Sequence, residues 1–477
     1  MIKKNTICLL LSALLFTNCS DWLNVAPDNQ VNEEQLFSTG DGYRNALNGV
    51  YLNLASGSLY GREMTWGFVD VIGQGYLNKK MDNITTYRKA SEYKYDDASV
   101  KSVISGIWST AYNDVANCNN LIRHVSVEDP KLFAYGEMER NMIWGEALAL
   151  RAFIHFDMLR LFAPAMIKDD QKSYIPYLET YPATSTSYES NTAILTKIKN
   201  DLIKAKELLA TCDLLPENKE WMETGVRMLA KGVESSVPED VFLAYRGFRM
   251  NYYAVTATLA RVYCWEGRYE DAFKQAKEVV DAKYDDDEDH RCFTFEEPTN
   301  LGSNMKDYNS IIMALSLETL PEDYLPYITS GNKTILLLDA DAIYEGSKED
   351  TRGTELLGTL DGNKYSMKNT IKKGEVGSDM IPVIRLSEMY YIMGEYYARN
   401  NQFKEASDAL GVVRSARGII SKSVQVSSVD AYKDEMLKEV RKEFVCEGQL
   451  FFQYKRLDKK PVLNTEFVLS RPENEDI

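Results

Sequence analysis

Two glutamates near the end of the chain have the residue type and spacing of an acid–base pair. Glu443 and Glu447 are four positions apart, so on a helix they share one face. Paired carboxylates can hydrolyse glycosidic bonds, one as the acid and the other as base or nucleophile. Arg441 and Arg456 are near in sequence, however, and we expect the glutamates to pair with them. G-x-S-x-G, P-loop and H-E-x-x-H motifs are absent, so we predict that the protein is not an enzyme.

The remaining candidates for metal chemistry are three histidines, an acidic run and the cysteines. His155 lies in an apolar helical stretch with Phe153 and Phe156, and we interpret it as a hydrogen-bonded core residue. The acidic run 285–289 lacks the spacing and the glycine of a calcium loop, which indicates a solvated loop. The cysteines beyond the N-terminal segment are widely spaced without C-x-x-C, so we expect small core residues, no metal and no cofactor. They are Cys118, Cys212, Cys264, Cys292 and Cys446.

The charge of the chain argues against nucleic acid as a partner. The 477 residues include 55 Lys and Arg against 71 Asp and Glu, a formal net charge of −16. An acidic surface is repelled by phosphate backbones. We therefore predict that the protein does not bind nucleic acid.

The first residues predict export and lipid attachment. Lys3 and Lys4 precede an apolar run over 7–16, which is too short to span a bilayer and is typical of a signal peptide. The run ends shortly before Cys19, in a pattern that resembles a bacterial lipobox. We predict a signal peptide over 1–18 and a lipid anchor on Cys19; an ordinary signal followed by a chance cysteine is the alternative.

The elements that follow are helical in period. Residues 250–284 predict two helices around a turn at Gly267, with alanines that let the helices approach closely, as in tetratricopeptide repeats. The pattern recurs at 387–417, with its turn at Asn401. We predict a mainly α, tetratricopeptide-like helical-hairpin scaffold with long loop insertions and a few short strands. Further units are expected near 108–163 and 190–210, and the insertions at 56–107, 164–189, 211–249 and 285–380.

Several motifs, in their order along the chain, resemble those of the SusD/RagB family of Bacteroidetes outer-membrane lipoproteins. Val440 stands where that family usually has Glu, and Leu450 where it often has Arg. The motif segments are Cys19–Pro27, Trp108–Asn119, Glu146–Leu161, Arg385–Tyr390, Arg414–Gly418 and Glu439–Arg456.

This resemblance implies one SusD-like domain over 19–477, with an N-terminal part over 19–250 and a C-terminal part over 251–477. It also implies a lipid-anchored protein at the outer membrane, exposed on the cell surface. Such a protein binds oligosaccharide or polysaccharide and delivers it to a SusC-like TonB-dependent transporter for import.

The aromatic residues suit such a ligand, because sugar rings present apolar C–H faces that pack on flat side chains, with polar groups at the rim. The chain has 30 Tyr, 17 Phe and 6 Trp. We expect tyrosines of the repeats, such as Tyr263, Tyr269 and Tyr397, to be core residues and aromatics of the insertions to bind ligand. The predicted ligand residues are Trp66, Tyr76, Asn83, Tyr87, Tyr308, Tyr324 and Tyr327, with Asn78 as a further hydrogen-bonding candidate.

Two other functions remain open at this point. One is a peptide-binding member of the same family, favoured by an acidic site with fewer stacked aromatics. The other is a tetratricopeptide lipoprotein that assembles proteins, in which the loop aromatics would be buried. Exposure of two or three loop rings in one open cleft would favour the glycan.

Overall fold

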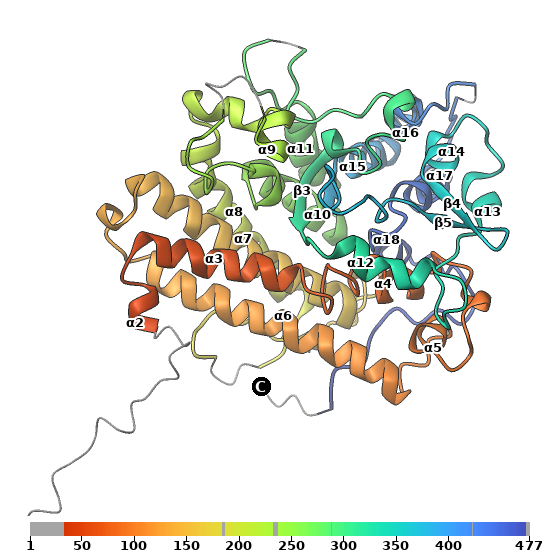
Figure 1. Ribbon diagram of the computed structural model, residues 1–477, viewed down its shortest axis with the longest axis horizontal. Helices are drawn as coiled ribbons and strands as arrows, with labels where there is room; N and C mark the ends of the chain where they lie inside the picture. Colours follow the sequence, from red (N-terminus) through yellow and green to blue (C-terminus); the bar gives the residue numbers. More distant parts are fainter. Residues whose placement is uncertain (1–32, 184–186, 232–236, 288, 422, 474–477) are drawn as a thin grey trace, which may run out of the picture.

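The computed structural model describes residues 33–183, 187–231, 237–287, 289–421 and 423–473, and Cys19 lies outside these ranges. Helices dominate the described residues, so the prediction of a mainly α protein is confirmed (Figure 1). None of these helices has the length and apolar character needed to cross a membrane.

Three long helices form the N-terminal half. They are α6 (Ala98–Val125), α7 (Gly136–Phe162) and α8 (Asn191–Asp213). Nearly every residue of α7 from 141 to 162 is buried, because α6 and α8 pack on two of its sides and the rest of the chain covers it. Trp108 of α6 meets Phe162 of α7 edge-on at 4.7 Å. The other helices of this half are α2 (Glu33–Leu36), α3 (Gly40–Leu54), α4 (Phe68–Ile72), α5 (Thr86–Ser91) and α9 (Thr224–Leu229).

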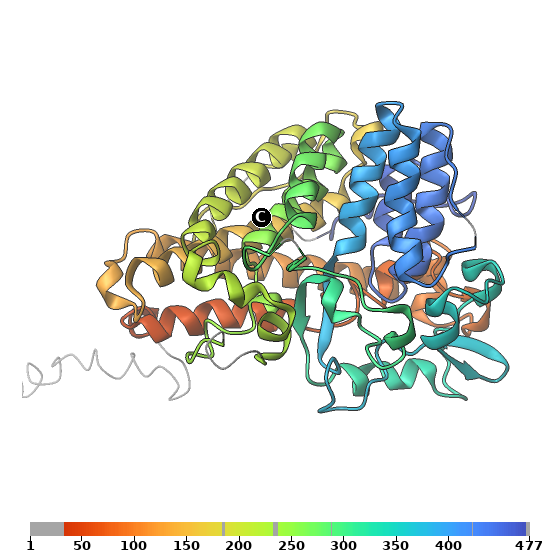
Figure 2. The same ribbon diagram turned by 90° about the horizontal axis from the view of Figure 1, so that it is seen from above.

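Two helical hairpins occupy the predicted repeats. Helices α10 (Tyr252–Glu266) and α11 (Tyr269–Val280) are joined at Gly267, whose φ of 86° lies in the left-handed region that glycine adopts readily. Helices α15 (Leu386–Arg399) and α16 (Phe403–Ala416) turn at Asn401. The hairpins are distant in sequence but pack through α11 and α15, where Phe273 stacks on Tyr396 at 4.3 Å. Helices α17 (Val429–Glu443) and α18 (Leu450–Arg456) complete this side of the molecule (Figure 2).

The strands are few and short, as expected. Antiparallel pairs form between β1 (Ser173–Ile175) and β2 (Glu189–Ser190), between β3 (Ile311–Ser316) and β6 (Met380–Arg385), and between β4 (Leu357–Leu360) and β5 (Asn363–Ser366). Strand β3 leads into α12 (Leu320–Tyr324) and the 3₁₀ turn η8 (Leu325–Ile328). Helices α13 (Ala340–Tyr344) and α14 (Thr351–Glu355) lie before β4. In Figure 2 the segment of α12 and η8 lies on the side away from the hairpins.

His155 and the cysteines are core residues, as predicted. The five cysteines are buried and free. The Nε2 atom of His155 accepts a hydrogen bond from the Leu178 N–H at 3.0 Å, and its Nδ1 lies 2.9 Å from the Arg151 carbonyl. Burial lowers the pKa of His155 to about 3, so the ring is neutral at pH 7.

The predicted partners of Glu443 and Glu447 are wrong. Helix α17 ends at Glu443, and Cys446 has a φ of 65°, so Glu447 is not on the same helix. Glu443 instead binds Arg417 and Arg352, while Glu447 binds Arg385 at 2.6 Å. These five residues form what we call the charge cluster, and each is less than 4% exposed except Glu447, at 4%. The structural interpretation of the glutamates stands, but tertiary contacts supply their partners.

Candidate functional site

Five of the six predicted aromatic side chains meet in one place. Trp66 precedes α4, and its ring lies 5.1 Å from both Tyr324 and Tyr327. Tyr87 of α5 stacks on Tyr327 at 5.9 Å, and Tyr76 donates a hydrogen bond from its hydroxyl to the Trp66 carbonyl at 2.7 Å. We call these five residues the aromatic cluster. It joins two insertions that are about 250 residues apart in the sequence.

Four of the five rings are closed to a ligand in this structure. Trp66, Tyr76, Tyr87 and Tyr324 are all less than 8% exposed. Their polar atoms are also engaged: the Trp66 Nε1–H donates to the Gly61 carbonyl at 2.9 Å, and the Tyr87 hydroxyl donates to Glu63 at 2.9 Å. The expectation that these rings are exposed platforms is corrected, because the insertions fold against each other and share a core. Two or three exposed loop rings in one open cleft, the feature expected of a glycan site, are therefore not found among these five residues.

Tyr327 is the half-buried member of the cluster, and the two segments that form the cluster also carry exposed residues. Asn83 is exposed, Ile84 and Leu325 are 64% and 58% exposed, and the Arg62 side chain is 38% exposed. We call these five residues the aromatic edge. It combines one half-buried ring, two apolar side chains, an amide and a guanidinium.

Backbone hydrogen bonds hold this edge together. The Asp82 N–H donates to the Lys333 carbonyl at 2.9 Å, and the Leu336 N–H donates to the Tyr327 carbonyl at 2.7 Å. The first bond fastens the loop that carries Asn83 to the segment that follows η8, and the second ties that segment back to Tyr327. In Figure 1, α5 and α12 lie at the same end of the molecule.

The electrostatics of the edge centre on Arg62. Burial lowers the pKa of Arg62, but the neighbouring Glu63 carboxylate and the hydroxyls of Tyr87 and Tyr327 more than offset this and raise it overall. Arg62 therefore stays charged, with its Nε 2.8 Å from Glu63. Charged and amide donors beside an aromatic ring can bind hydroxyl groups in a fixed orientation.

Two other candidates lie apart from this edge. Tyr308 is half-buried and packs on the small apolar group of Met228, Ile311, Ala314 and Met380. Asn78 is 9% exposed and donates to the Gln74 side chain at 2.9 Å. The sequence analysis did not find Arg62, Ile84 and Leu325. Their types carry no local signal, because only the contact between the two insertions brings them together.

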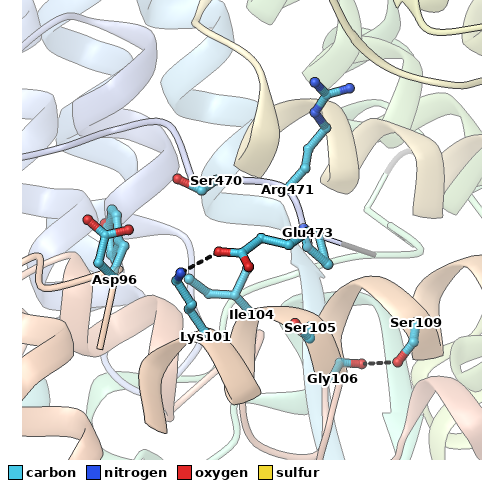
Figure 3. Close-up of a pocket in the computed structure, with 11 residues that line it drawn as sticks. Asp96, Lys101, Ile104, Ser105, Gly106, Ser109, Ser470, Arg471 and Glu473 are labelled. Atoms are coloured by element: carbon cyan, nitrogen blue, oxygen red, sulfur yellow. Dashed lines mark hydrogen bonds and ion pairs between the residues drawn. The ribbon is translucent and has the colours of Figure 1, made fainter. Parts of the chain in front are cut away.

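A cavity of about 600 Å³ lies between α6 and the C-terminal segment (Figure 3). Its walls carry Lys101 paired with Glu473 at 2.6 Å, and Asp96, Ser105 and Ser109. Tyr95 also lines it but is 7% exposed. The cavity thus has one ion pair, further polar groups and no open ring, and none of the predicted ligand residues lines it.

The residue types at the aromatic edge suit the binding of a ligand and include no carboxylate or histidine that could act as an acid or base. No group of histidine, cysteine, aspartate or glutamate in the described residues is arranged to hold a metal ion. The buried carboxylates of the charge cluster are engaged with guanidinium groups.

Comparison with known families gives two matches in separate parts of the chain. Residues 21–220 match a family described as "Starch-binding associating with outer membrane". Residues 340–467 match one described as "SusD family". The two matched segments lie on either side of the hairpin of α10 and α11.

Individual proteins agree with these matches. The chain is 26% identical to a SusD-like protein P2 of Formosa agariphila over 161 residues, which is 34% of this chain and 30% of the relative. It is also 26% identical to a SusD-like protein of Bacteroides ovatus over 176 residues, 36% of this chain and again 30% of the relative. The alignments therefore span about a third of either curated relative.

Solved structures share the fold over most of the chain. A SusD superfamily protein of Bacteroides thetaiotaomicron has a TM-score of 0.66 at 22% identity and covers 88% of this chain and 89% of its own. A putative sugar binding protein of Bacteroides vulgatus has a TM-score of 0.65 at 19% identity, with coverage of 88% and 87%. The two family matches and the two curated relatives support a SusD/RagB family protein, and the solved structures show that it shares the fold of SusD superfamily members.

Proposed function

We propose that this protein binds a glycan through the aromatic edge at the outer membrane. The observation that carries the proposal is the half-buried ring of Tyr327, which packs on a buried aromatic base and lies near Arg62. A sugar ring packs its C–H face on such a ring while the polar groups bind its hydroxyls. The description of the matching family as starch-binding supports this ligand class.

The finer parts of the proposal concern location and delivery. We propose that Cys19 carries the lipid anchor, and that the bound glycan passes to a SusC-like TonB-dependent transporter. Family membership and the description of association with the outer membrane support these steps. We propose no catalytic step.

The test is binding of the purified protein to neutral glycans. Isothermal titration would use malto-, xylo-, manno- and cello-oligosaccharides, and affinity electrophoresis the matching polysaccharides. Tyr327→Ala should weaken binding by about 1–3 kcal/mol, the range known for stacking of nucleic-acid bases on aromatic side chains. Tyr174, another half-buried tyrosine, lies on β1, and Tyr174→Ala is the matched control with unchanged affinity expected.

Two results would overturn the proposal. If the protein binds no glycan at millimolar glycan concentration but does bind peptides, the result would favour peptide import. Unchanged glycan affinity in Tyr327→Ala would remove the aromatic edge from the site.

A further inference from the structure

A second pocket, of about 480 Å³, lies at the start of the segment that leads to the aromatic edge. It is formed where α9 and the 3₁₀ turn η5 (Arg246–Phe248) approach the end of β3 and the start of β6. We call it the Tyr245 pocket. Its lining residues include Met228, Leu229, Lys231, Tyr245, Phe248, Ser316, Val376, Asp379 and Met380.

The interior of this pocket is apolar and aromatic. Met228 and Met380 are almost fully buried, at 1% and 2% exposed. Tyr245 is 39% exposed and lies edge-on to Phe248, with the ring centroids 6.3 Å apart, and Val376 is 51% exposed. The pocket therefore combines a fixed apolar base with an open aromatic ring, the arrangement that receives the C–H face of a sugar.

The backbone of Tyr245 is unusual for an exposed aromatic residue. Its φ of 55° and ψ of 39° lie in the left-handed region, which glycine adopts at lower cost. The Phe248 N–H donates to the Tyr245 carbonyl at 2.9 Å and holds this turn. Strained positions of this kind concentrate at functional sites. Because the ring is partly exposed, packing alone does not account for a tyrosine here.

The rim of the pocket carries one positive and one negative group. Lys231 is exposed and makes no ion pair within the described part of the chain. Asp379 accepts a hydrogen bond from the Ser316 hydroxyl. The rim thus offers donors and acceptors with no net charge, while the whole chain has a net charge of −16. Both features favour a neutral sugar over a uronate or sulfated one.

The pocket and the aromatic edge are linked by a short piece of chain. Ser316 lines the pocket, and α12 and η8 then carry Tyr324 and Tyr327. Eleven residues span at most about 40 Å when fully extended. Figures 1 and 2 both place β3 and α12 on the same side of the molecule. A glycan long enough to span this separation would meet both places.

We propose that the Tyr245 pocket is a second binding site for a neutral sugar ring of the same glycan that contacts the aromatic edge. The proposal rests on the glycan binding proposed above. Two linked contacts raise the apparent affinity for a long ligand, because the second contact forms within the complex. A ligand too short to reach both sites gains nothing from the linkage.

The experiment compares trisaccharides with polysaccharides. Affinity electrophoresis on soluble starch, xylan and mannan, and titration with maltotriose, xylotriose and mannotriose, would use the full mature protein. Tyr245→Ala should weaken polysaccharide binding about tenfold and leave the affinity of the aromatic edge for the trisaccharide unchanged. Tyr245→Phe keeps the ring and should bind as wild type. Polygalacturonate should not bind.

Two further variants control for folding and surface effects. Tyr245→Gly removes the ring and accepts the left-handed backbone without strain, so it should fold and show the same loss as Tyr245→Ala. Tyr135 is 41% exposed and does not line the pocket, so Tyr135→Ala should bind as wild type. Thermal unfolding would confirm that each variant is folded.

The outcomes separate the two proposals. Polysaccharide binding that is unchanged in both Tyr245→Ala and Tyr245→Gly, but weakened in Tyr327→Ala, overturns the second site alone. A wild-type protein that binds none of the glycans overturns the proposed function and the second site together. An equal loss in Tyr135→Ala also overturns the second site.

Discussion

The charge cluster and the aromatic cluster are both buried and both join distant parts of the chain, but they differ at their boundaries. In the charge cluster the carboxylates of Glu443 and Glu447 bind guanidinium groups inside the protein. The aromatic cluster ends in the half-buried ring of Tyr327. The first fits a role in holding the fold, and the second carries the half-buried ring that we propose as the ligand contact.

The sequence motifs divide in the same way. Arg385, Arg417, Glu443 and Glu447 belong to the segments that carry the family resemblance, and they are internal ion pairs. Tyr327 lies in an insertion outside these segments. The residues of the family motifs therefore stabilise the scaffold, while residues of the insertions are the candidates for determining ligand specificity.

The largest expected effect is on stability, from Glu443→Ala. This change leaves the buried guanidinium groups of Arg352 and Arg417 without one of their carboxylates. Breaking a buried ion pair in this way costs about 3–5 kcal/mol of unfolding free energy. Urea unfolding measures it, and glycan affinity of the folded fraction should be unchanged.

The control for that prediction lies on the same helix. Glu435 has a 30% exposed side chain and pairs with Lys438 at 2.7 Å. Because such surface pairs contribute at most about 1 kcal/mol, Glu435→Ala should be nearly neutral. Equal losses in the two variants would contradict the special role of the charge cluster.

The two clusters should respond to opposite ends of the pH range. Burial alone raises the pKa of Glu443, but the Arg417 guanidinium outweighs it and holds the pKa below its ordinary value of 4.5. The unfolded state then binds more protons below pH 4.5, so this contribution is present above pH 4.5 and is lost as the pH falls. Burial raises the pKa of Tyr76 above 10.0, so its contribution is present below pH 10.0 and is lost as the pH rises further.

Urea unfolding at a series of pH values measures the pH dependence of stability on its acid side (the acid limb) and on its alkaline side (the alkaline limb). Each group contributes a slope of up to about 1.4 kcal/mol per pH unit. Glu443→Gln should flatten the acid limb, and Tyr76→Phe should flatten the alkaline limb. A variant that altered the other limb instead would show that the clusters are not separate.

The smallest effect is expected from Tyr76→Phe at neutral pH. The variant loses the hydrogen bond to the Trp66 carbonyl and leaves that buried oxygen without this donor. The expected loss is about 0.5–1.5 kcal/mol of unfolding free energy, measured in urea. Tyr174→Phe removes an exposed hydroxyl bonded to Asp170 and should have less effect. Loss of glycan binding in Tyr76→Phe, with the fold intact, would instead place Tyr76 at the ligand.

We expected the tyrosines of the repeats to be core residues and the aromatics of the insertions to be exposed to ligand. The structure partly reverses this expectation. Tyr263, Tyr269 and Tyr397 of the hairpins are only half-buried, whereas Trp66 and Tyr324 of the insertions are almost completely buried. The hairpin tyrosines lie at helix surfaces; Tyr269, for example, is covered by the Arg399 guanidinium at 3.7 Å. Such side chains pack their apolar parts and leave their polar tips near water.

The hairpin helices, their turns and the family resemblance could be predicted from the residues alone. A helical repeat and a turn at Gly267 or Asn401 depend on neighbours within a few residues, so periodicity and residue type predict them. The burial of His155 follows in the same way from its apolar helix.

Tertiary structure alone decided which charges pair and which rings remain open. Glu447 meets Arg385 because the chain leaves α17 at Glu443, and Tyr327 meets Trp66 because two distant insertions fold together. Local propensity carries no information about such pairings, since they are set by the packing of the whole chain. The aromatic edge and the Tyr245 pocket are products of that packing.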